Sequence, residues 1–375
     1  MIIDHKIKSK KLAVLIPDGE WEKLSNHVIN CLSEYNDICL YVMSNRKYIP
    51  SRYSRFVKGF TYNPKTDDPS LWINSINKVV RKHEIDLILP VYEDGIGRLI
   101  KYKGQLHDPN KLVILPSLSF FETARSKLKL AAHLAKHGIP GPRIFILKSD
   151  SDITNARSYY PIIAKPVEGT TGGRGILLFN DEITLLEFLK NKNEDDPKLV
   201  FQEYIKGYDI DCSVLCREGN IEAFTIQKGT LYDTKNFSPP IGIQFVYESR
   251  LYDVVAKLMR TLNWSGVAHV DLRYDMINNE YKVIEVNCRF WGTLDASLLA
   301  GVNFPYLYCL LTLNKEFKLP KYRHIPFLNL KAIVRKVRSN VLFLFKFNFI
   351  WNYTALKFLI KDPFPVFIKI LQYIK

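Results

Sequence analysis

Residues 161–175 read PIIAKPVEGTTGGRG, and the prediction of the fold starts from this pattern. A short apolar run predicts a buried strand that carries Lys165, after which the chain enters a loop. Two threonines stand among the glycines of this loop: Gly169, Thr170, Thr171, Gly172, Gly173 and Gly175. Glycine lets successive backbone N–H groups approach an anion, and the hydroxyls and the lysine add donors and charge. We therefore expect a phosphate-binding loop, with a glycine-rich hairpin turn as the simpler alternative.

A second pattern lies on two later predicted strands. Period-2 alternation in GVAHVDLRYD (266–275) groups on one face Val267, His269, Asp271, Arg273 and Asp275. The same alternation in EYKVIEVNCRF (280–290) groups Tyr281, Val283, Glu285, Asn287 and Arg289. The turn between them pairs the strands antiparallel, so that Asp271, Glu285 and Asn287 converge. Carboxylate and amide oxygens are ligands that suit Mg²⁺ beside nucleotide phosphates.

The alternative for these strands is a solvated face with surface ion pairs, which is common for a stripe of acids and arginine. Against it, Tyr281 and Val283 are predicted to share the acidic face, and the opposite face of the second strand is also apolar. Such a strand is covered on both sides. Carboxylates on a covered strand need a cation, which favours a metal site. We interpret His269 as a structural neighbour of this site.

Together these motifs resemble the ATP-grasp superfamily over residues 1 to about 312. The resemblance implies that two lysines contact nucleotide phosphates: Lys127, before a helix ending in GIP, and Lys165. It also implies an adenine-binding hinge in QEYI (202–205), formed by Glu203, Tyr204 and Ile205. The family's metal signature, a carboxylate strand followed by an E-x-N-x-R strand, matches Asp271, Glu285, Asn287 and Arg289.

Some positions depart from the family pattern. Asp209, implied to hold the ribose hydroxyls, and Asp271 stand where a longer acid is common, and Cys288 stands where proline is frequent. The ligand type in the metal site is retained, although a shorter acid loosens its geometry.

The resemblance implies ATP and Mg²⁺ as cofactors, with Mn²⁺ as the alternative metal. A small-molecule carboxylate is phosphorylated and an amine captures the acyl-phosphate, as in carbamoyl-phosphate-synthase-like and D-alanine ligase-like carboxylate–amine ligases. Lys165, Arg289 and Arg273 are the candidate catalytic residues, although Arg273 has an ion pair with Asp271 or Asp275 as its alternative. The rival functions are an ATP-grasp kinase and a non-catalytic nucleotide-binding or membrane-associated protein.

Alternating strand-like and helix-like segments predict a doubly wound α/β domain over residues 1–118, with strands near 12–16, 38–43, 87–90 and 112–115. At the end of the third of these strands, Glu93 and Asp94 are candidates for the acceptor side of the cleft or simply caps of the next helix. A β-rich α+β unit follows over 119–324, the expected ATP-grasp domain, with an ATP-binding subdomain at about 140–205 and a C-terminal subdomain at about 206–324. Residues 325–375 are expected to form a basic, apolar helical extension.

The net charge of +15 is concentrated at the ends of the chain. Residues 331–375 contain nine lysines or arginines and one acid, and the near-neutral middle argues against a nucleic-acid partner. A basic, aromatic tail can contact an anionic membrane or another protein, but we favour a tail that packs its apolar stripe on the catalytic body. Dispersed cysteines and the lack of a secretory signal predict a cytoplasmic protein, peripheral to the inner membrane face if the tail binds lipid. The family resemblance also suggests a homodimer.

Overall fold

The computed structural model describes residues 11–145, 147, 153, 156–167, 173, 175–191, 193, 197–234 and 237–374. By their contacts they form two compact units. The first contains Met1–Leu118, Arg289–Tyr322 and Asn348–Lys375, and the second contains Ser119–Cys288 and Arg323–Phe347. These units divide the chain differently from the expected domains, because residues 289–322 group with the first unit and the tail is shared between the two.

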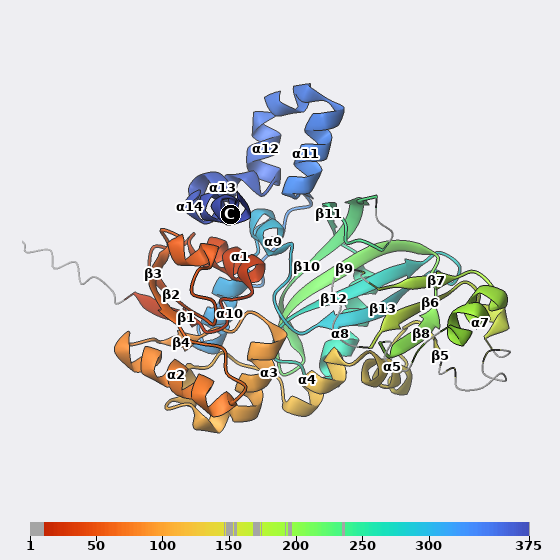
Figure 1. Ribbon diagram of the computed structural model, residues 1–375, viewed down its shortest axis with the longest axis horizontal. Coiled ribbons are helices and arrows are strands. Elements are labelled where there is room, and N and C mark those ends of the chain that lie inside the picture. Colours follow the sequence, from red (N-terminus) through yellow and green to blue (C-terminus); the bar gives the residue numbers. More distant parts are fainter. Residues whose placement is uncertain are drawn as a thin grey trace, which may run out of the picture. The chain divides into compact units, whose positions relative to one another are not determined.

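The first unit is built on a parallel sheet with the strand order β3-β2-β1-β4 (Figure 1). Its strands are β1 (Leu12–Ile16), β2 (Ile38–Ser44), β3 (Val57–Tyr62) and β4 (Leu87–Ile88). The central strand β1 pairs with β2 and β4, and Val14, Leu15 and Ile16 have no solvent exposure. Apolar strands covered on both faces are typical of parallel sheets, and the predicted doubly wound α/β fold is confirmed.

Two strands of this sheet differ from the prediction. The strand β3 was not expected, because as a half-exposed edge strand its sequence VKGFTY lacks a continuous apolar run. The strand expected at 112–115 is reduced to a single parallel bridge between Ile88 and Leu112.

Helices from distant parts of the chain cover this sheet. They are α1 (Glu22–Leu32), α2 (Pro69–Lys82), α3 (Glu93–Tyr102), α9 (Leu294–Ala300) and α10 (Phe304–Thr312), with short 3-10 turns η1 (Pro50–Tyr53), η2 (Lys103–Gln105) and η3 (Pro109–Lys111). The His27 ring on α1 lies 2.7 Å from the Asp295 carboxylate on α9, and Asn303 donates to the carbonyl of Cys31 at 2.7 Å. These contacts explain why residues 289–322 belong to the first unit.

The end of the chain also packs on the first unit. It forms α12 (Phe347–Tyr353), α13 (Leu356–Lys361) and α14 (Phe364–Ile374). Lys361 makes an ion pair with Glu34 at 3.0 Å, the backbone N–H of Arg55 donates to Asp362, and the side chain of Phe358 is buried. This part of the tail is therefore a helical appendage packed on the first unit, as the favoured prediction stated.

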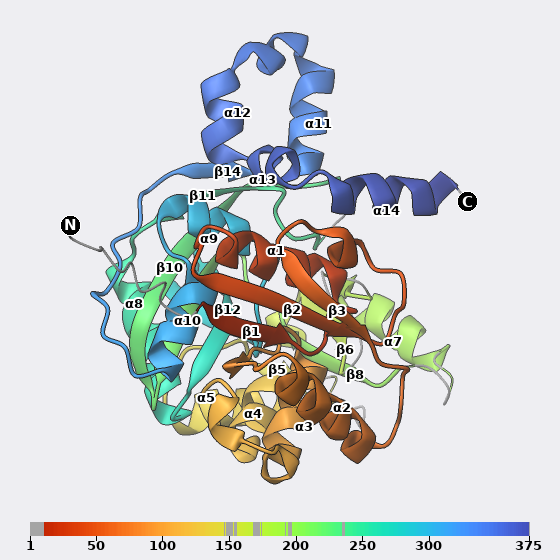
Figure 2. The ribbon, with the colours of Figure 1, turned by 90° about the vertical axis from the view of Figure 1, so that its left-hand side faces the viewer.

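The second unit contains two antiparallel sheets (Figures 1 and 2). The larger, in the order β13-β12-β9-β10-β11-β14, consists of β9 (Gly207–Arg217), β10 (Asn220–Leu231), β11 (Gly242–Val246), β12 (Gly266–Asp275), β13 (Glu280–Asn287) and β14 (Pro326–Leu328). The smaller, in the order β5-β8-β6-β7, consists of β5 (Ile144–Phe145), β6 (Ile162–Pro166), β7 (Leu177–Phe179) and β8 (Leu199–Glu203). These sheets agree with the predicted α+β unit.

The second unit also contains several helices. They are α4 (Leu118–Arg125), α5 (Lys127–Lys136), α7 (Glu182–Lys190), α8 (Ser249–Thr261) and α11 (Leu330–Ser339), with 3-10 turns η4 (Arg157–Tyr159) and η5 (Val341–Phe345). Helix α8 packs on β9, β10 and β13, and Leu251, Val255 and Leu258 on its inner face are fully buried. Among the described residues no single helix has the length and apolar composition to cross a membrane, and α9 and α10 meet that criterion only as a pair bent by 86°.

Candidate functional site

The hairpin of β12 and β13 brings the three predicted metal ligands together. In its register Asp271 lies opposite Glu285, and His269 lies opposite Asn287. The amide nitrogen of Asn287 donates to Asp271 Oδ2 at 3.2 Å and to Glu285 Oε1 at 3.4 Å. Two carboxylates and one amide therefore converge at one end of the hairpin, as the alternation predicted.

A β-bulge changes the rest of the predicted face. The register shifts between Asp271 and Leu272, so that Ile284 on β13 has no partner and Leu272 lies opposite Val283. A bulge reverses the alternation beyond it. Tyr281 and Val283 are consequently not on the acidic face, as period-2 counting had placed them, and the side chain of Lys282 takes that face instead. These two apolar residues therefore do not lie over the carboxylates, and the prediction that they share the acidic face was wrong.

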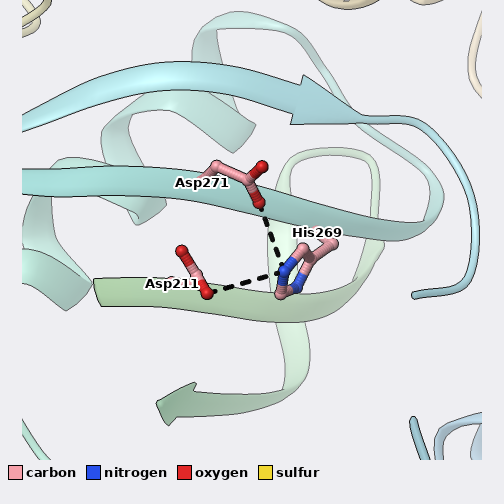
Figure 3. A group of neighbouring side chains, drawn as sticks. All are labelled: Asp211, His269 and Asp271. Atoms are coloured by element: carbon pink, nitrogen blue, oxygen red, sulfur yellow. Dashed lines mark ion pairs between the residues drawn. The ribbon is translucent and has the colours of Figure 1, made fainter. Parts of the chain in front are cut away.

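The neighbouring strand β9 adds a carboxylate that the sequence analysis missed. Asp211 lies opposite Asp271 in the register between β9 and β12. The Nε2 atom of His269 is 3.2 Å from Asp271 Oδ1 and 3.9 Å from Asp211 Oδ2 (Figure 3). Its Nδ1 atom is 2.9 Å from the hydroxyl of Ser213. The ligand atoms of the two acids and the histidine lie within 4.8 Å of one another. The alternation of Asp209 and Asp211 in YDIDC was the signal that could have placed Asp211 here.

Electrostatics make this end of the sheet strongly acidic. Burial raises the pKa of Asp211 well above its ordinary value, and the charges of Asp209 and Glu285 raise it further, against a hydrogen bond from Gln227. Within the described residues, neither Asp211 nor Glu285 forms an ion pair with a lysine or an arginine. Such a concentration of carboxylates calls for a cation.

Two predicted phosphate-binding lysines lie in the electrostatic range of this acidic end. Lys165 on β6 is only 9% exposed, and burial lowers the pKa of its ammonium below the ordinary value. The nearby charge of Glu285, and more weakly that of Asp271, opposes this lowering, whereas Lys127 adds to it. Lys127 is the first residue of α5, whose N-cap Ser126 accepts from the N–H of Lys129. Lys165 thus lies within the electrostatic range of Glu285 and Asp271, and Lys127 lies within the range of Lys165.

Only part of the predicted phosphate loop can be described. Gly169, Thr170, Thr171 and Gly172 lie outside the described residues. Gly173 and Gly175 both have positive φ, of 75° and 73°. A Cβ atom on Gly173 would come 1.8 Å from the carbonyl oxygen of Phe237, so that only glycine fits at this position.

The predicted hinge follows β8. The N–H of Glu203 donates to the carbonyl of Arg143 at 2.9 Å, and the N–H of Tyr204 donates to the carbonyl of Pro161 at 3.2 Å. Ile205 is 3% exposed, and within the described part of the chain its N–H makes no backbone hydrogen bond. A buried N–H without an acceptor costs free energy unless a ligand satisfies it. Ile205 therefore offers a hydrogen bond to a bound group.

Arg273 connects this hinge to β9. Its Nε donates to the carbonyl of Ile205 at 2.7 Å, one terminal nitrogen donates to the carbonyl of Gly207 at 2.8 Å, and the other makes an ion pair with Asp209. Arg273 thus forms its ion pair with Asp209, and not with Asp271 or Asp275, the partners predicted from the sequence. These contacts favour a positioning role for Arg273 over the catalytic role predicted from its strand face.

A buried network of ion pairs also holds the hinge residue Glu203. The ammonium of Lys282 lies 2.9 Å from Asp275 and 3.1 Å from Glu203. Burial raises the pKa of Asp275, but hydrogen bonds from Asn278, Lys282 and two backbone N–H groups outweigh it and hold the value at about 2. The side chain of Glu203 is therefore occupied within the protein, which leaves its backbone for any ligand.

Arg289, the last predicted site residue, is part of the first unit. Its guanidinium lies 5.4 Å from the ring centre of Tyr92, and its Nε is 3.7 Å from the Glu93 carboxylate. Trp21 stacks on Tyr92 with 3.5 Å between ring centres. The fully buried Asp18 accepts hydrogen bonds from the N–H groups of Val91 and Tyr92 and so fixes the loop that carries these rings.

This cluster lies where ligands commonly bind in open α/β sheets. Trp21 follows β1 and Tyr92 follows β4, two neighbouring strands between which the direction of the strand order reverses. Glu93 and Asp94 form the first turn of α3. Glu93, Asp94 and Arg289 could be predicted from the sequence, whereas Trp21 and Tyr92 could not, because single aromatic residues in loops carry no pattern.

Comparison with known proteins agrees with this architecture. The family model for the ATP-grasp domain matches residues 124–293. N5-carboxyaminoimidazole synthetase from Staphylococcus aureus, solved with ADP, is 17% identical, with 88% of this chain and 87% of that chain covered at a TM-score of 0.66. The biotin carboxylase domain of 2-oxoglutarate carboxylase from Hydrogenobacter thermophilus, solved with MgADP, ADP and bicarbonate, is 17% identical over 83% and 72% of the chains at a TM-score of 0.61.

A third structure of similar fold is the L-amino acid ligase from Bacillus licheniformis. It is 18% identical, with 84% of this chain and 75% of that chain covered at a TM-score of 0.60. The resemblance inferred from the sequence is confirmed: this chain has the ATP-grasp fold, and the family model for the ATP-grasp domain matches its residues 124–293.

Proposed function

We propose that this protein is an ATP-dependent, ADP-forming ligase that joins a carboxylate to an amine through an acyl-phosphate. The observation that carries the proposal is the grouping of a buried lysine, Lys165, with the oxygen-ligand set of Asp271, Glu285 and Asn287. A lysine beside a cation-binding acidic cluster is suited to the triphosphate of a nucleotide. ATP use also supports the expected cytoplasmic location.

The donor set fits Mg²⁺, with Mn²⁺ as the alternative. Three side chains that carry hard oxygen ligands converge on one place, and one amide nitrogen links both carboxylates. Asp271, Glu285 and Asn287 would hold the ion, with Asp211 and His269 beside them. The bound ion supplies positive charge that offsets the charge of the transferred phosphoryl oxygens.

The hinge is suited to adenine. The buried N–H of Ile205 is free to donate to a ring nitrogen, and Arg273 fixes the hinge by holding the carbonyls of Ile205 and Gly207. Asp209 is held by Arg273 and is 36% exposed at its side chain, so that it remains accessible to ribose hydroxyls. These residues bind and orient the nucleotide.

In the first step an oxygen of the substrate carboxylate forms a bond to the γ-phosphorus and the bond to the β-phosphate oxygen breaks, releasing ADP. Lys127 and Lys165 offset phosphate charge throughout. In the second step the amine nitrogen bonds to the acyl carbon, loses a proton, and phosphate leaves. Within the first unit, the guanidinium of Arg289 is suited to bind a carboxylate, because it can do so in two-point geometry. The rings of Trp21 and Tyr92 offer an apolar surface for the rest of that substrate.

The proposal is tested by measuring ADP release from ATP and Mg²⁺ with a panel of amino acids and other carboxylates, with and without amines. A carboxylate that stimulates ADP release and yields a hydroxamate with hydroxylamine supports the ligase. A stable phosphorylated product that hydroxylamine does not capture would instead identify an ATP-grasp kinase. Nucleotide binding without turnover for any substrate would favour the non-catalytic alternative.

A further inference from the structure

The segment from α11 to the start of α12 exposes apolar side chains instead of packing them. None of residues 334–347 is buried, and only Val337 and Phe343 are half-buried. Large apolar side chains in this segment are between 47% and 71% exposed: Val334, Val341, Leu342, Leu344, Phe345 and Phe347. Exposed apolar residues normally occur singly on a protein surface, whereas a contiguous group marks an interaction site.

The exposed side chains form a continuous stripe. Leu330, Val334 and Val337 recur at helical spacing along one side of α11, and the stripe continues through Val341 into η5. The opposite side of the helix holds it to its own unit: Ala332 is fully buried, Lys331 makes an ion pair with Asp233, and Arg335 donates to the carbonyl of Tyr232. Figure 2 shows α11 leading away from β14, which forms the edge of the larger sheet. The apolar stripe is therefore displayed by an anchored helix.

The charge of this segment is of one sign. Residues 325–361 contain no aspartate or glutamate. Lys336 and Arg338 flank the stripe on α11, and Lys346 stands between the exposed Phe345 and Phe347. Basic residues beside exposed aromatic and aliphatic side chains are the composition of segments that lie in the headgroup region of an anionic bilayer.

We propose that residues 330–347 form a docking surface for an anionic lipid bilayer, with the apolar side chains of η5 entering the interface and Lys336, Arg338 and Lys346 contacting lipid phosphates. The positive charge of the segment complements anionic lipid headgroups, and its exposed apolar tip suits the interface beneath them. Both features favour a bilayer over a protein groove. The surface shares no residue with the candidate nucleotide site, so that the proposal does not depend on the proposed ligase reaction.

Co-sedimentation of the full chain with vesicles tests this surface. We expect binding to vesicles of phosphatidylcholine mixed with phosphatidylglycerol, weak or no binding to phosphatidylcholine alone, and a decrease in binding as salt is raised. The double substitution Leu342→Ser with Phe345→Ser removes two exposed apolar side chains and should weaken the partition by roughly a hundredfold. Charge reversal by Lys336→Glu, Arg338→Glu and Lys346→Glu should abolish binding to the anionic vesicles.

Ile183→Ser, which removes an isoleucine that is 70% exposed on α7, is the matched control and should bind like the natural sequence. Thermal unfolding of each variant checks that the fold is retained. The proposal is overturned if the full chain does not bind anionic vesicles at low salt, or if Leu342→Ser with Phe345→Ser leaves binding unchanged. It is also overturned if that variant converts an oligomer into a monomer while vesicles are not bound, because the surface would then be a protein interface.

Discussion

The two ends of the β12–β13 hairpin carry charged side chains in different states of pairing. Near the turn, Lys282 contacts Asp275 and Glu203, and Arg273 contacts Asp209 and two hinge carbonyls. At the other end, Asp211, Asp271 and Glu285 gather around one histidine and one amide. Charges that are balanced inside the protein hold the fold, whereas a surplus of one sign marks where a ligand completes the site. The difference is testable at each end.

The largest effect is expected from Glu285→Gln at the acidic end. Loss of a ligand that holds positive charge on the transferred phosphoryl group should lower ADP formation about a thousandfold. Stability measured by urea unfolding should change little, because the charge that is removed crowds Asp211 but also stabilises the ammonium of Lys165. Glu280→Gln, on the same strand near the turn, is the control and should retain activity. A stability loss with unchanged activity would place Glu285 among the structural charges.

At the paired end, Lys282→Met should affect stability. The substitution leaves Asp275 and Glu203 without their buried partner, which costs about 3–5 kcal/mol of unfolding free energy. Lys129→Met, which breaks an ion pair with Glu122 between side chains that are 58% and 53% exposed, should cost at most about 1 kcal/mol. Equal effects of the two substitutions would contradict the interpretation of Lys282 as a buried support.

Arg273→Lys separates a positioning role from a catalytic one. The single nitrogen of a lysine cannot replace the three separate guanidinium nitrogens that contact two carbonyls and one carboxylate. The hinge should therefore loosen, and KM for ATP should rise about tenfold to a hundredfold. The value of kcat should change little, because the contacts of Arg273 are to the hinge and Asp209. Arg250→Lys, which alters a contact with the turn residue Asn279, is the control. A lower kcat with unchanged KM would restore the catalytic assignment.

The smallest effect is a pH dependence at Asp275. The pKa of this carboxyl is held at about 2, below its ordinary value of 3.8, so its contribution to stability is complete above that ordinary value and is lost as the pH falls toward 2. Asp275→Asn should therefore reduce stability at neutral pH, and the difference from the natural sequence should shrink as the solution is acidified through this range. Urea unfolding over a series of pH values measures it. Asp67→Asn, at an exposed position, should show no such convergence.

Much of the candidate site could be predicted because its signals are local. The alternation on each strand placed Asp271, Glu285 and Asn287 on one face, and the apolar run predicted the buried strand of Lys165. The bulge at Ile284 could not be predicted, because one unpaired residue leaves no trace in the composition of a strand. It moved Lys282 onto the face that Tyr281 and Val283 were expected to share.

Residues brought together from distant strands were also beyond prediction. Asp211 lies beside Asp271 only because β9 pairs with β12, and the pairing of Arg273 with Asp209 depends on the same register. Trp21 and Tyr92 meet because β1 and β4 are neighbours in a sheet whose order no short motif specifies. The number of ways to pair strands is large, and each is decided by packing over the whole sheet.

By itself, the sequence determined the fold class and the convergence of Asp271, Glu285 and Asn287, since apolar periodicity and glycine positions act over a few residues. The selection of Lys127 came from the resemblance to the ATP-grasp superfamily. The sequence also showed that positive charge gathers in the last part of the chain. Only the tertiary structure decided which charges are balanced within the protein, and that the tail is divided, with Phe358 buried and Phe345 exposed. Burial and ion pairing depend on what surrounds a side chain, and the surroundings are set by contacts between residues far apart in the chain.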